Sequence, residues 1–95
     1  MFNQKTHENS EQLVEEEVSI KYAYKVILFN DDWHSFDEVI AQIMKAIHCN
    51  REKAISLTTQ VHNMGKAVVF QGELQQCLKV SSVLEEIALH TQIES

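Results

Sequence analysis

The most unusual segment of the sequence places an amide, two carboxylates, an indole and an imidazole side by side: Asn30, Asp31, Asp32, Trp33 and His34. Its ordinary interpretation is a polar turn, because Asn and Asp side chains compete for backbone groups and favour turns. Two adjacent carboxylates nevertheless repel each other unless they are solvated or matched to a cation. The segment is therefore a candidate site for a cationic ligand such as an ammonium group.

A second candidate is His62, which precedes Asn63, Met64 and Gly65 at the predicted end of a helix. Taken alone, it is best interpreted as a helix-end histidine, whose charged form the helix dipole favours. The functional alternative is a neutral imidazole that accepts a hydrogen bond from a cation.

The enzymatic alternatives are less well supported. Asp31 and Asp32 offer acid and base groups, but they point to opposite sides if the backbone is extended. Cys49 follows His48 directly, yet sequence neighbours rarely face each other, and Cys77 lies on an apolar helical stripe. No glycine-rich phosphate loop, zinc-ligand spacing or nucleotide-binding unit is present. We therefore expect a non-enzymatic protein without a cofactor or a resident metal.

Two alternatives stay open beside that expectation. A metal site from Asp31, Asp32, His34 and His62 has the right donor atoms but no recognised spacing. A thiol enzyme that uses one of the two cysteines is the other.

Composition limits the partners. The 95 residues suit one domain with a modest core, and a formal net charge of −6 disfavours a nucleic-acid surface. No run approaches the roughly 18 apolar residues of a membrane span, and the first residues lack the apolar stretch of a secretory signal. Cys49 and Cys77 lie in apolar-periodic segments, which indicates buried thiols in a reducing compartment. We expect a cytoplasmic location.

The elements that position these residues follow from periodicity. Residues 1–18 are polar and acidic without apolar periodicity, which predicts a flexible arm before a core domain at 19–95. Residues 22–29 are β-branched and aromatic, which predicts a central strand. Ser35 and Glu38 have the spacing of a capping box, so a helix begins at Phe36. Its apolar residues then recur at intervals of three and four.

The second half of the chain alternates in the same way. Asn50 is positioned to cap a helix over 51–63, with a buried stripe of Ala54, Ile55, Leu57 and Val61, and Gly65 suits the left-handed residue after its last turn. A strand over 66–71, a helix over 73–89 and a short last strand over 91–94 follow. The order βααβαβ predicts a small α+β sandwich, in which three helices pack on a three-stranded antiparallel sheet.

Two linked motifs carry a resemblance to a known family. Tyr24-Lys-Val-Ile-Leu-Phe-Asn-Asp-Asp32, followed by Val61-His-Asn-Met-Gly-Lys-Ala67, closely resembles the ClpS family of Clp protease adaptors. The family's signature is Y-K-V-I-L-x-N-D-D and then V-H-x-x-G-K-A about 30 residues later, a separation that this sequence keeps without a gap. The resemblance extends from about Tyr22 to Ile87.

The resemblance implies recognition of protein N-termini. Family members bind proteins whose first residue is Leu, Phe, Tyr or Trp and deliver them to an AAA+ unfoldase of the Clp protease. The residues implied to contact the substrate's α-amino group are Asn30, Asp31 and His62, supported by Asp32 and by His34 on the rim. An ammonium offers three donors to match an amide oxygen, a carboxylate and a neutral imidazole.

The resemblance also implies an apolar pocket for the first side chain, lined by Phe36, Val39, Thr58 and Val61. Docking on the N-terminal domain of the unfoldase would involve Glu73 and Lys79. Family members commonly carry Thr-Pro-Met where this chain has His34-Ser35-Phe36, and an apolar residue at the place of Thr58. The alternative function is therefore a divergent paralogue that modulates an unfoldase or another assembly without binding N-termini.

Overall fold

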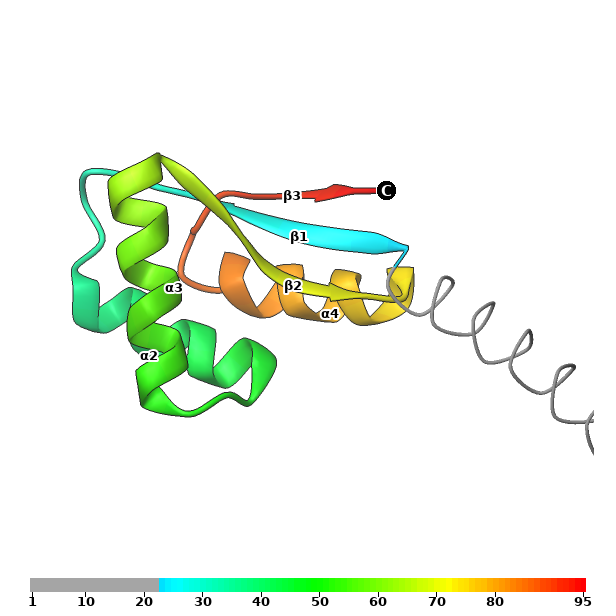
Figure 1. The fold of residues 1–95 in the computed structure, drawn as a ribbon, viewed down its shortest axis with the longest axis horizontal. Helices are drawn as coiled ribbons and strands as arrows, with labels where there is room; N and C mark the ends of the chain where they lie inside the picture. Colours follow the sequence, from blue (N-terminus) through cyan, green and yellow to red (C-terminus); the bar gives the residue numbers. More distant parts are fainter. Residues whose placement is uncertain (1–22) are drawn as a thin grey trace, which may run out of the picture.

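The sheet is built around the predicted central strand. The computed structural model describes residues 23–95, whose elements follow the predicted order βααβαβ (Figure 1). They are β1 (Tyr24–Phe29), α2 (Phe36–Ile47), α3 (Arg51–Met64), β2 (Lys66–Gly72), α4 (Leu74–Glu85) and β3 (Thr91–Glu94). Both β2 and β3 pair antiparallel with β1, which gives the sheet order β2-β1-β3. The predicted α+β fold and its last strand are confirmed, whereas the arm predicted at 1–18 lies outside the described residues.

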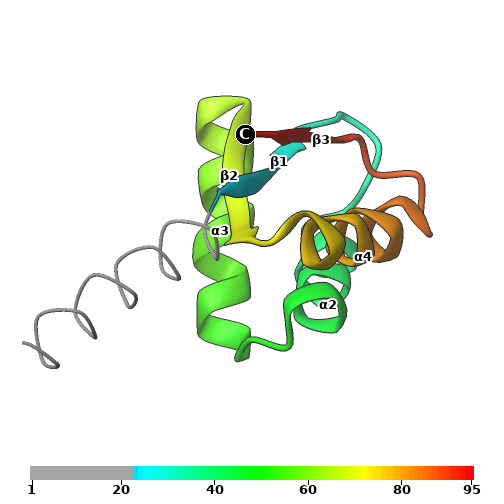
Figure 2. The same cartoon turned by 90° about the vertical axis from the view of Figure 1, so that its right-hand side faces the viewer.

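The helices form a layer on one side of the sheet (Figures 1 and 2). α4 packs under all three strands, α3 packs beside β2, and α2 packs against both other helices. Val26 and Leu28 of β1 are fully buried in the shared core, together with Ile43 of α2 and Leu84 of α4. The continuous apolar run of β1 thus reflects a strand at the centre of the domain.

The helix signals in the sequence are realised at the predicted positions. Ser35 caps α2, since its Oγ accepts a hydrogen bond from the Glu38 N–H and the Glu38 carboxylate accepts one from the Ser35 N–H. Asn50 caps α3, because its Oδ1 accepts a hydrogen bond from the Lys53 N–H. Gly65 follows α3 with a left-handed φ of 85°. Ser35 and Gly65 thus fix the ends of α2 and α3 that border the candidate site, whereas Asn50 fixes the opposite end of α3.

The predicted buried face of α3 was partly wrong. The buried face of α3 is Ala54, Thr58 and Val61, whereas Ile55 is 39% exposed, because the residues that point inward recur four and three positions apart.

The predicted helix over 73–89 ends instead at Glu85. The chain reverses at Ala88, whose φ is 64°, so that Leu89 is buried and the His90 carbonyl accepts a hydrogen bond from the Phe29 N–H. Pairing of the last strand with β1 thus overrides the helical preference of residues 86–88.

Candidate functional site

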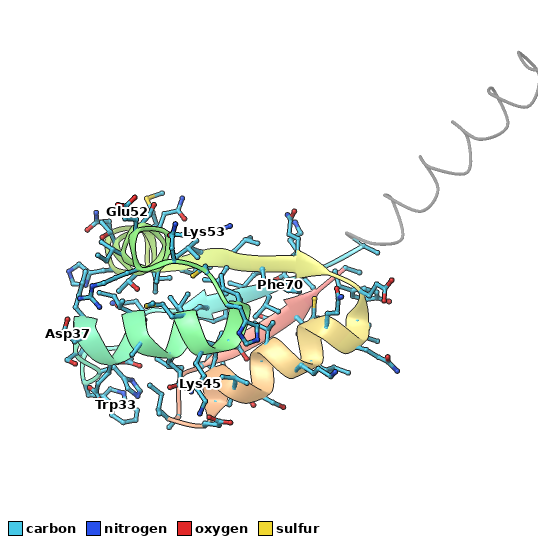
Figure 3. All side chains as sticks on the ribbon, turned by 90° about the horizontal axis from the view of Figure 1, so that it is seen from below. Trp33, Asp37, Lys45, Glu52, Lys53 and Phe70 are labelled. Carbon is cyan, nitrogen blue, oxygen red and sulfur yellow. The ribbon has the colours of Figure 1, made fainter. Side chains whose placement is uncertain are left out.

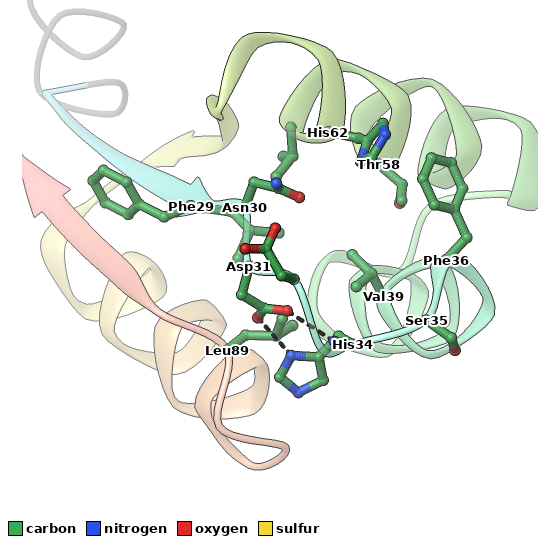
Figure 4. Close-up of a pocket in the computed structure, with 13 residues that line it drawn as sticks. Phe29, Asn30, Asp31, His34, Ser35, Phe36, Val39, Thr58, His62 and Leu89 are labelled. Atoms are coloured by element: carbon green, nitrogen blue, oxygen red, sulfur yellow. Dashed lines mark hydrogen bonds and ion pairs between the residues drawn. The ribbon is translucent and has the colours of Figure 1, made fainter.

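A cavity of about 230 Å³ lies between the loop after β1, the start of α2 and the last turns of α3 (Figure 4). All nine residues that the sequence assigned to amino-group binding, support or the apolar pocket line this cavity. The lining is Leu28, Phe29, Asn30, Asp31, Asp32, His34, Ser35, Phe36, Val39, Thr58, Val61, His62 and Leu89. The fold thus brings two motifs that are far apart in the sequence to one site.

The two motifs are joined by the pairing of Leu28 and Phe29 with Ala67 and Lys66, and one further backbone hydrogen bond extends this pairing to the site. The Asn30 N–H, just after β1, donates to the Gly65 carbonyl, just after α3, at 2.9 Å. Gly65 itself donates its N–H to the Val61 carbonyl, which closes the last turn of the helix that carries His62. Asn30 and His62 are therefore held at neighbouring positions on the cavity wall by main-chain geometry.

The Asp31 carboxylate organises the loop between β1 and α2. Its Oδ1 accepts hydrogen bonds from the backbone N–H groups of Trp33 at 3.1 Å and His34 at 2.8 Å, which is an Asx turn. Its Oδ2 lies 2.6 Å from Nδ1 of the His34 ring, as the dashed lines in Figure 4 mark. The protein itself thus supplies a partner for this carboxylate, whereas the sequence suggested a ligand ammonium as its match.

His34, which was expected on the rim of the pocket, lines the cavity with its side chain turned away from solvent. Its side chain is only 5% exposed, and its Nε2 lies 2.5 Å from the carbonyl oxygen of Ile87, beyond the end of α4. Burial opposes the charged imidazole, but the hydrogen bonds to Asp31 and Ile87 prevail and raise the pKa of His34. Burial likewise opposes the charged Asp31, yet the hydrogen bonds from His34 and Trp33 lower the pKa of Asp31.

The second carboxylate differs from the first. Asp32 is exposed, and its side chain makes no hydrogen bond or ion pair with any other part of residues 23–95. Trp33 is 69% exposed and projects from the loop before α2 (Figure 3). Asp32 therefore adds a negative charge beside the cavity that no other residue of 23–95 pairs with.

The other end of the cavity is apolar. Val61 is buried, Val39 is partly buried, and the Phe36 ring meets the His62 ring edge to face, with centroids 5.3 Å apart. Thr58 is 3% exposed, and its hydroxyl donates to the Ala54 carbonyl at 2.7 Å. Because that hydroxyl proton is already used within α3, Thr58 adds little polarity to the wall.

Several contributors escaped the sequence reasoning. Leu89 lines the cavity and the Ile87 carbonyl holds His34, but both lie in the segment predicted to be helical. A backbone carbonyl has no residue-type signature, so no sequence signal for the Ile87 contact exists. The proposed docking residues lie elsewhere: Glu73 precedes α4 and Lys79 is within it, and both are exposed.

The enzymatic alternatives gain no support. Cys49 and Cys77 are free thiols, and burial raises the pKa of Cys77 despite a hydrogen bond to the Gly72 carbonyl, which disfavours a reactive thiolate. Among residues 23–95, no three His, Cys, Asp or Glu side chains are arranged to hold a metal ion. No helix in the same range is long and apolar enough to cross a bilayer.

Comparison with known proteins places these observations in a family. The family model for the ATP-dependent Clp protease adaptor protein ClpS matches residues 20–93. The ClpS adapter of Thermosynechococcus vestitus is 44% identical over 54 residues, which cover 56% of this chain and 57% of that protein. The human E3 ubiquitin-protein ligase UBR2 is 36% identical over 61 residues, covering 64% of this chain but 4% of the ligase.

A solved structure has the same fold. The structure of Agrobacterium tumefaciens ClpS2 bound to L-phenylalaninamide superimposes with a TM-score of 0.66 at 23% identity, covering 75% of this chain and 93% of that one. The match spans little more than half the length of the Thermosynechococcus vestitus adapter. The match of the family model to most of the sequence shows that the chain belongs to the ClpS family of ATP-dependent Clp protease adaptor proteins.

Proposed function

We propose that this chain binds proteins through their free α-amino group and a bulky apolar first residue, and delivers them to a Clp AAA+ unfoldase. ClpS proteins are adaptors and not enzymes, so the activity to explain is recognition. The observation that carries the proposal is the division of one cavity into a polar end with hydrogen-bond acceptors and an apolar end.

The polar end suits an ammonium group. Asn30 offers an amide oxygen, His62 offers an imidazole nitrogen when neutral, and Asp31 keeps acceptor capacity on Oδ2 beyond its bond to His34. These groups would accept the three N–H donors of an α-amino group, while Asp32 supplies charge. An internal residue has no free amine, so the same acceptors would discriminate against it.

The apolar end suits one side chain. The whole cavity, about 230 Å³, is smaller than the ~300–1,000 Å³ of sites that hold drug-sized ligands. The ligand of the ClpS2 structure, L-phenylalaninamide, has this chemistry, with an aromatic side chain beside a free α-amino group. Leu, Phe, Tyr and Trp are the first residues that we assign to this pocket.

The two kinds of relative support recognition as the shared activity. The same stretch occurs in adapters of the Clp protease and in an E3 ubiquitin-protein ligase, which belong to different machineries. What they have in common is therefore better explained by binding of a substrate than by docking on one unfoldase. We assign docking on the N-terminal domain of the unfoldase to the exposed Glu73 and Lys79.

A binding assay tests the proposal. Fluorescent peptides that start with Leu, Phe, Tyr or Trp are titrated with the full chain, in free-amine and acetylated forms. The free-amine peptides should bind and the acetylated forms should bind far more weakly. Equal binding of the two forms, or no binding of either, contradicts the proposal. An unfoldase domain that binds the chain when no peptide does would instead support the paralogue function.

Variants assign the roles. Asp31→Ala and His62→Ala should each weaken free-amine binding by about tenfold or more, the size of a lost charge-assisted hydrogen bond. Asp37→Ala is a matched control, because its carboxylate is 90% exposed and lies outside the cavity. An equal loss of affinity in Asp37→Ala would show that the net negative charge of the protein, and not the cavity, causes the preference for free-amine peptides.

A further inference from the structure

The two ring nitrogens of His34 face two hydrogen-bond acceptors. Nδ1 lies 2.6 Å from the Asp31 carboxylate, and Nε2 lies 2.5 Å from the Ile87 carbonyl. A neutral imidazole has one N–H and one lone pair, so only the imidazolium donates at both positions. In the neutral form, a lone pair would face an oxygen atom inside a nearly closed environment, where repulsion is poorly screened.

The other groups around His34 also favour a cation. The Glu38 carboxylate, on the first turn of α2, acts on the ring at longer range and with the same sign as Asp31. The Trp33 ring lies against it, with centroids 4.3 Å apart and the planes tilted by 34°. A cation near an aromatic face at this separation is stabilised by the ring quadrupole. The loop, α2 and the chain beyond α4 thus all present negative or electron-rich groups to His34.

We propose that His34 is a positively charged positioning residue, which holds the Asp31 carboxylate in place for the ligand's α-amino group and ties this loop to Ile87. The positioning role rests on the proposed function, whereas the charge on His34 does not. Trp33 and His34 donate to Oδ1 of Asp31 and the ring donates to Oδ2, so the carboxylate cannot rotate. Its remaining acceptor capacity then has a fixed direction.

In this arrangement the carboxylates of Asp31 and Asp32 have different roles. His34 offsets the charge of Asp31, which acts mainly through direction, whereas the exposed Asp32 keeps its charge. The free-amine preference should therefore depend on the orientation of Asp31 as well as on net charge. A residue that neutralises part of the site would otherwise be expected only to weaken the binding of a cation.

The charge is tested first on the free full chain, without any peptide. Trp33 is the only tryptophan, so its fluorescence reports the state of the adjacent His34, and ¹⁵N NMR shows whether both ring nitrogens carry protons. At pH 7 we expect a doubly protonated His34 and a fluorescence transition above the ordinary histidine range. His34→Gln should abolish that transition, which separates it from the other histidines. A singly protonated His34 at pH 7 overturns the proposal.

The positioning role is tested by the ratio of affinities for Phe-starting peptides in free-amine and acetylated forms. His34→Gln should reduce this ratio about tenfold, with little change in the affinity of the acetylated peptide, measured by NMR titration. A purely structural role would weaken both forms alike, so an unchanged ratio overturns the positioning claim. If the unsubstituted chain shows no free-amine preference, the proposed function and the positioning role both fail, while the titration alone still decides the charge.

Discussion

Phe36 and His62, which both line the cavity, are in edge-to-face contact, with ring centroids 5.3 Å apart and planes inclined at 75°. Phe36 begins α2 and His62 lies in the last turn of α3, so this contact closes the gap between the two helices at the site. Edge-to-face pairs of this kind contribute roughly 0.5–1.5 kcal/mol beyond simple burial. Phe36 therefore forms part of the apolar pocket and also restrains the ring that we assign to the amino group.

Phe36→Ala should weaken the binding of Phe- and Leu-starting peptides about 2- to 10-fold, because it removes both the pocket wall and the restraint on His62. The free energy of unfolding should fall by about 1–3 kcal/mol, because the ring is more than half covered at 43% exposure and its contact with His62 is also lost. Peptide titration and urea denaturation measure the two effects. Leu74→Ala removes a comparably exposed apolar side chain outside the cavity and should leave binding unchanged. Equal losses of peptide affinity in the two variants would refute the specific role of Phe36.

The wall residue Thr58 should set the size of the first residue that fits. Thr58→Met places a longer side chain in a cavity of about 230 Å³. The affinity for Trp-starting peptides should therefore fall about fivefold or more relative to that for Leu-starting peptides. A series of Leu, Phe and Trp peptides measures the change in preference. The Thr58→Val variant is the matched control.

Thr58→Val nearly keeps the shape of the wall and replaces a hydroxyl that already donates to the Ala54 carbonyl with a methyl group. Its affinities should therefore stay within about twofold of the original values. A large loss would mean that the hydroxyl takes part in binding, and an unchanged preference in Thr58→Met would place the first side chain elsewhere.

The agreement between sequence and structure is closest where residue type decides geometry. The caps Ser35 and Asn50 and the left-handed Gly65 were predictable, since few other residues satisfy those backbone positions. The grouping of Asn30 with His62 followed from the spacing of the two motifs and their resemblance to a family. The face of α3 was predicted less well, because Ile55 and Thr58 exchange the places that their hydrophobicity suggests.

The partner of Asp31 could not be predicted in the same way. The sequence shows two adjacent carboxylates, but only the Asx turn brings His34, three residues later, back to Asp31. The other contact of His34 is to the carbonyl of Ile87, 53 positions away, in a segment whose residues favour helix. Its position depends on Ala88 adopting a positive φ, which tertiary pairing imposes and which local propensity opposes.

The Asp31–His34 pair should make stability depend on pH in a defined window. The pKa of Asp31 is lowered from 3.8 on folding, so its contribution is present above that value and is lost as the pH falls through the folded pKa. The pKa of His34 is raised from 6.5, so its contribution is present below that value and is lost as the pH rises through the folded pKa. The pair therefore stabilises most between about pH 4 and 6.5.

His34→Gln should accordingly lower the free energy of unfolding by ~1–3 kcal/mol at pH 5.5, and by progressively less as the pH rises through the raised pKa of His34. Urea denaturation of His34→Gln, Asp31→Asn and the double variant measures the coupling at each pH. Lys45→Gln breaks an exposed ion pair to Glu86 and should show little effect at pH 5.5. A coupling that is constant from pH 5.5 to 9 would contradict a charged pair.

The last prediction concerns Gly65, which joins the two motifs. Its φ is 85°, and its carbonyl accepts the hydrogen bond from the Asn30 N–H at 2.9 Å. Gly65→Ala meets no atom within 4 Å, so its cost is backbone strain of about 1–2 kcal/mol rather than a clash. We expect urea denaturation to show this loss in the free energy of unfolding. Free-amine peptides should also bind more weakly, because the strain displaces the carbonyl that accepts the Asn30 N–H. Gly65→Asn should recover part of both, because Asn tolerates the left-handed conformation better than Ala. If Asn and Ala are equally destabilising, the strain argument is wrong and the side chain itself disturbs the site.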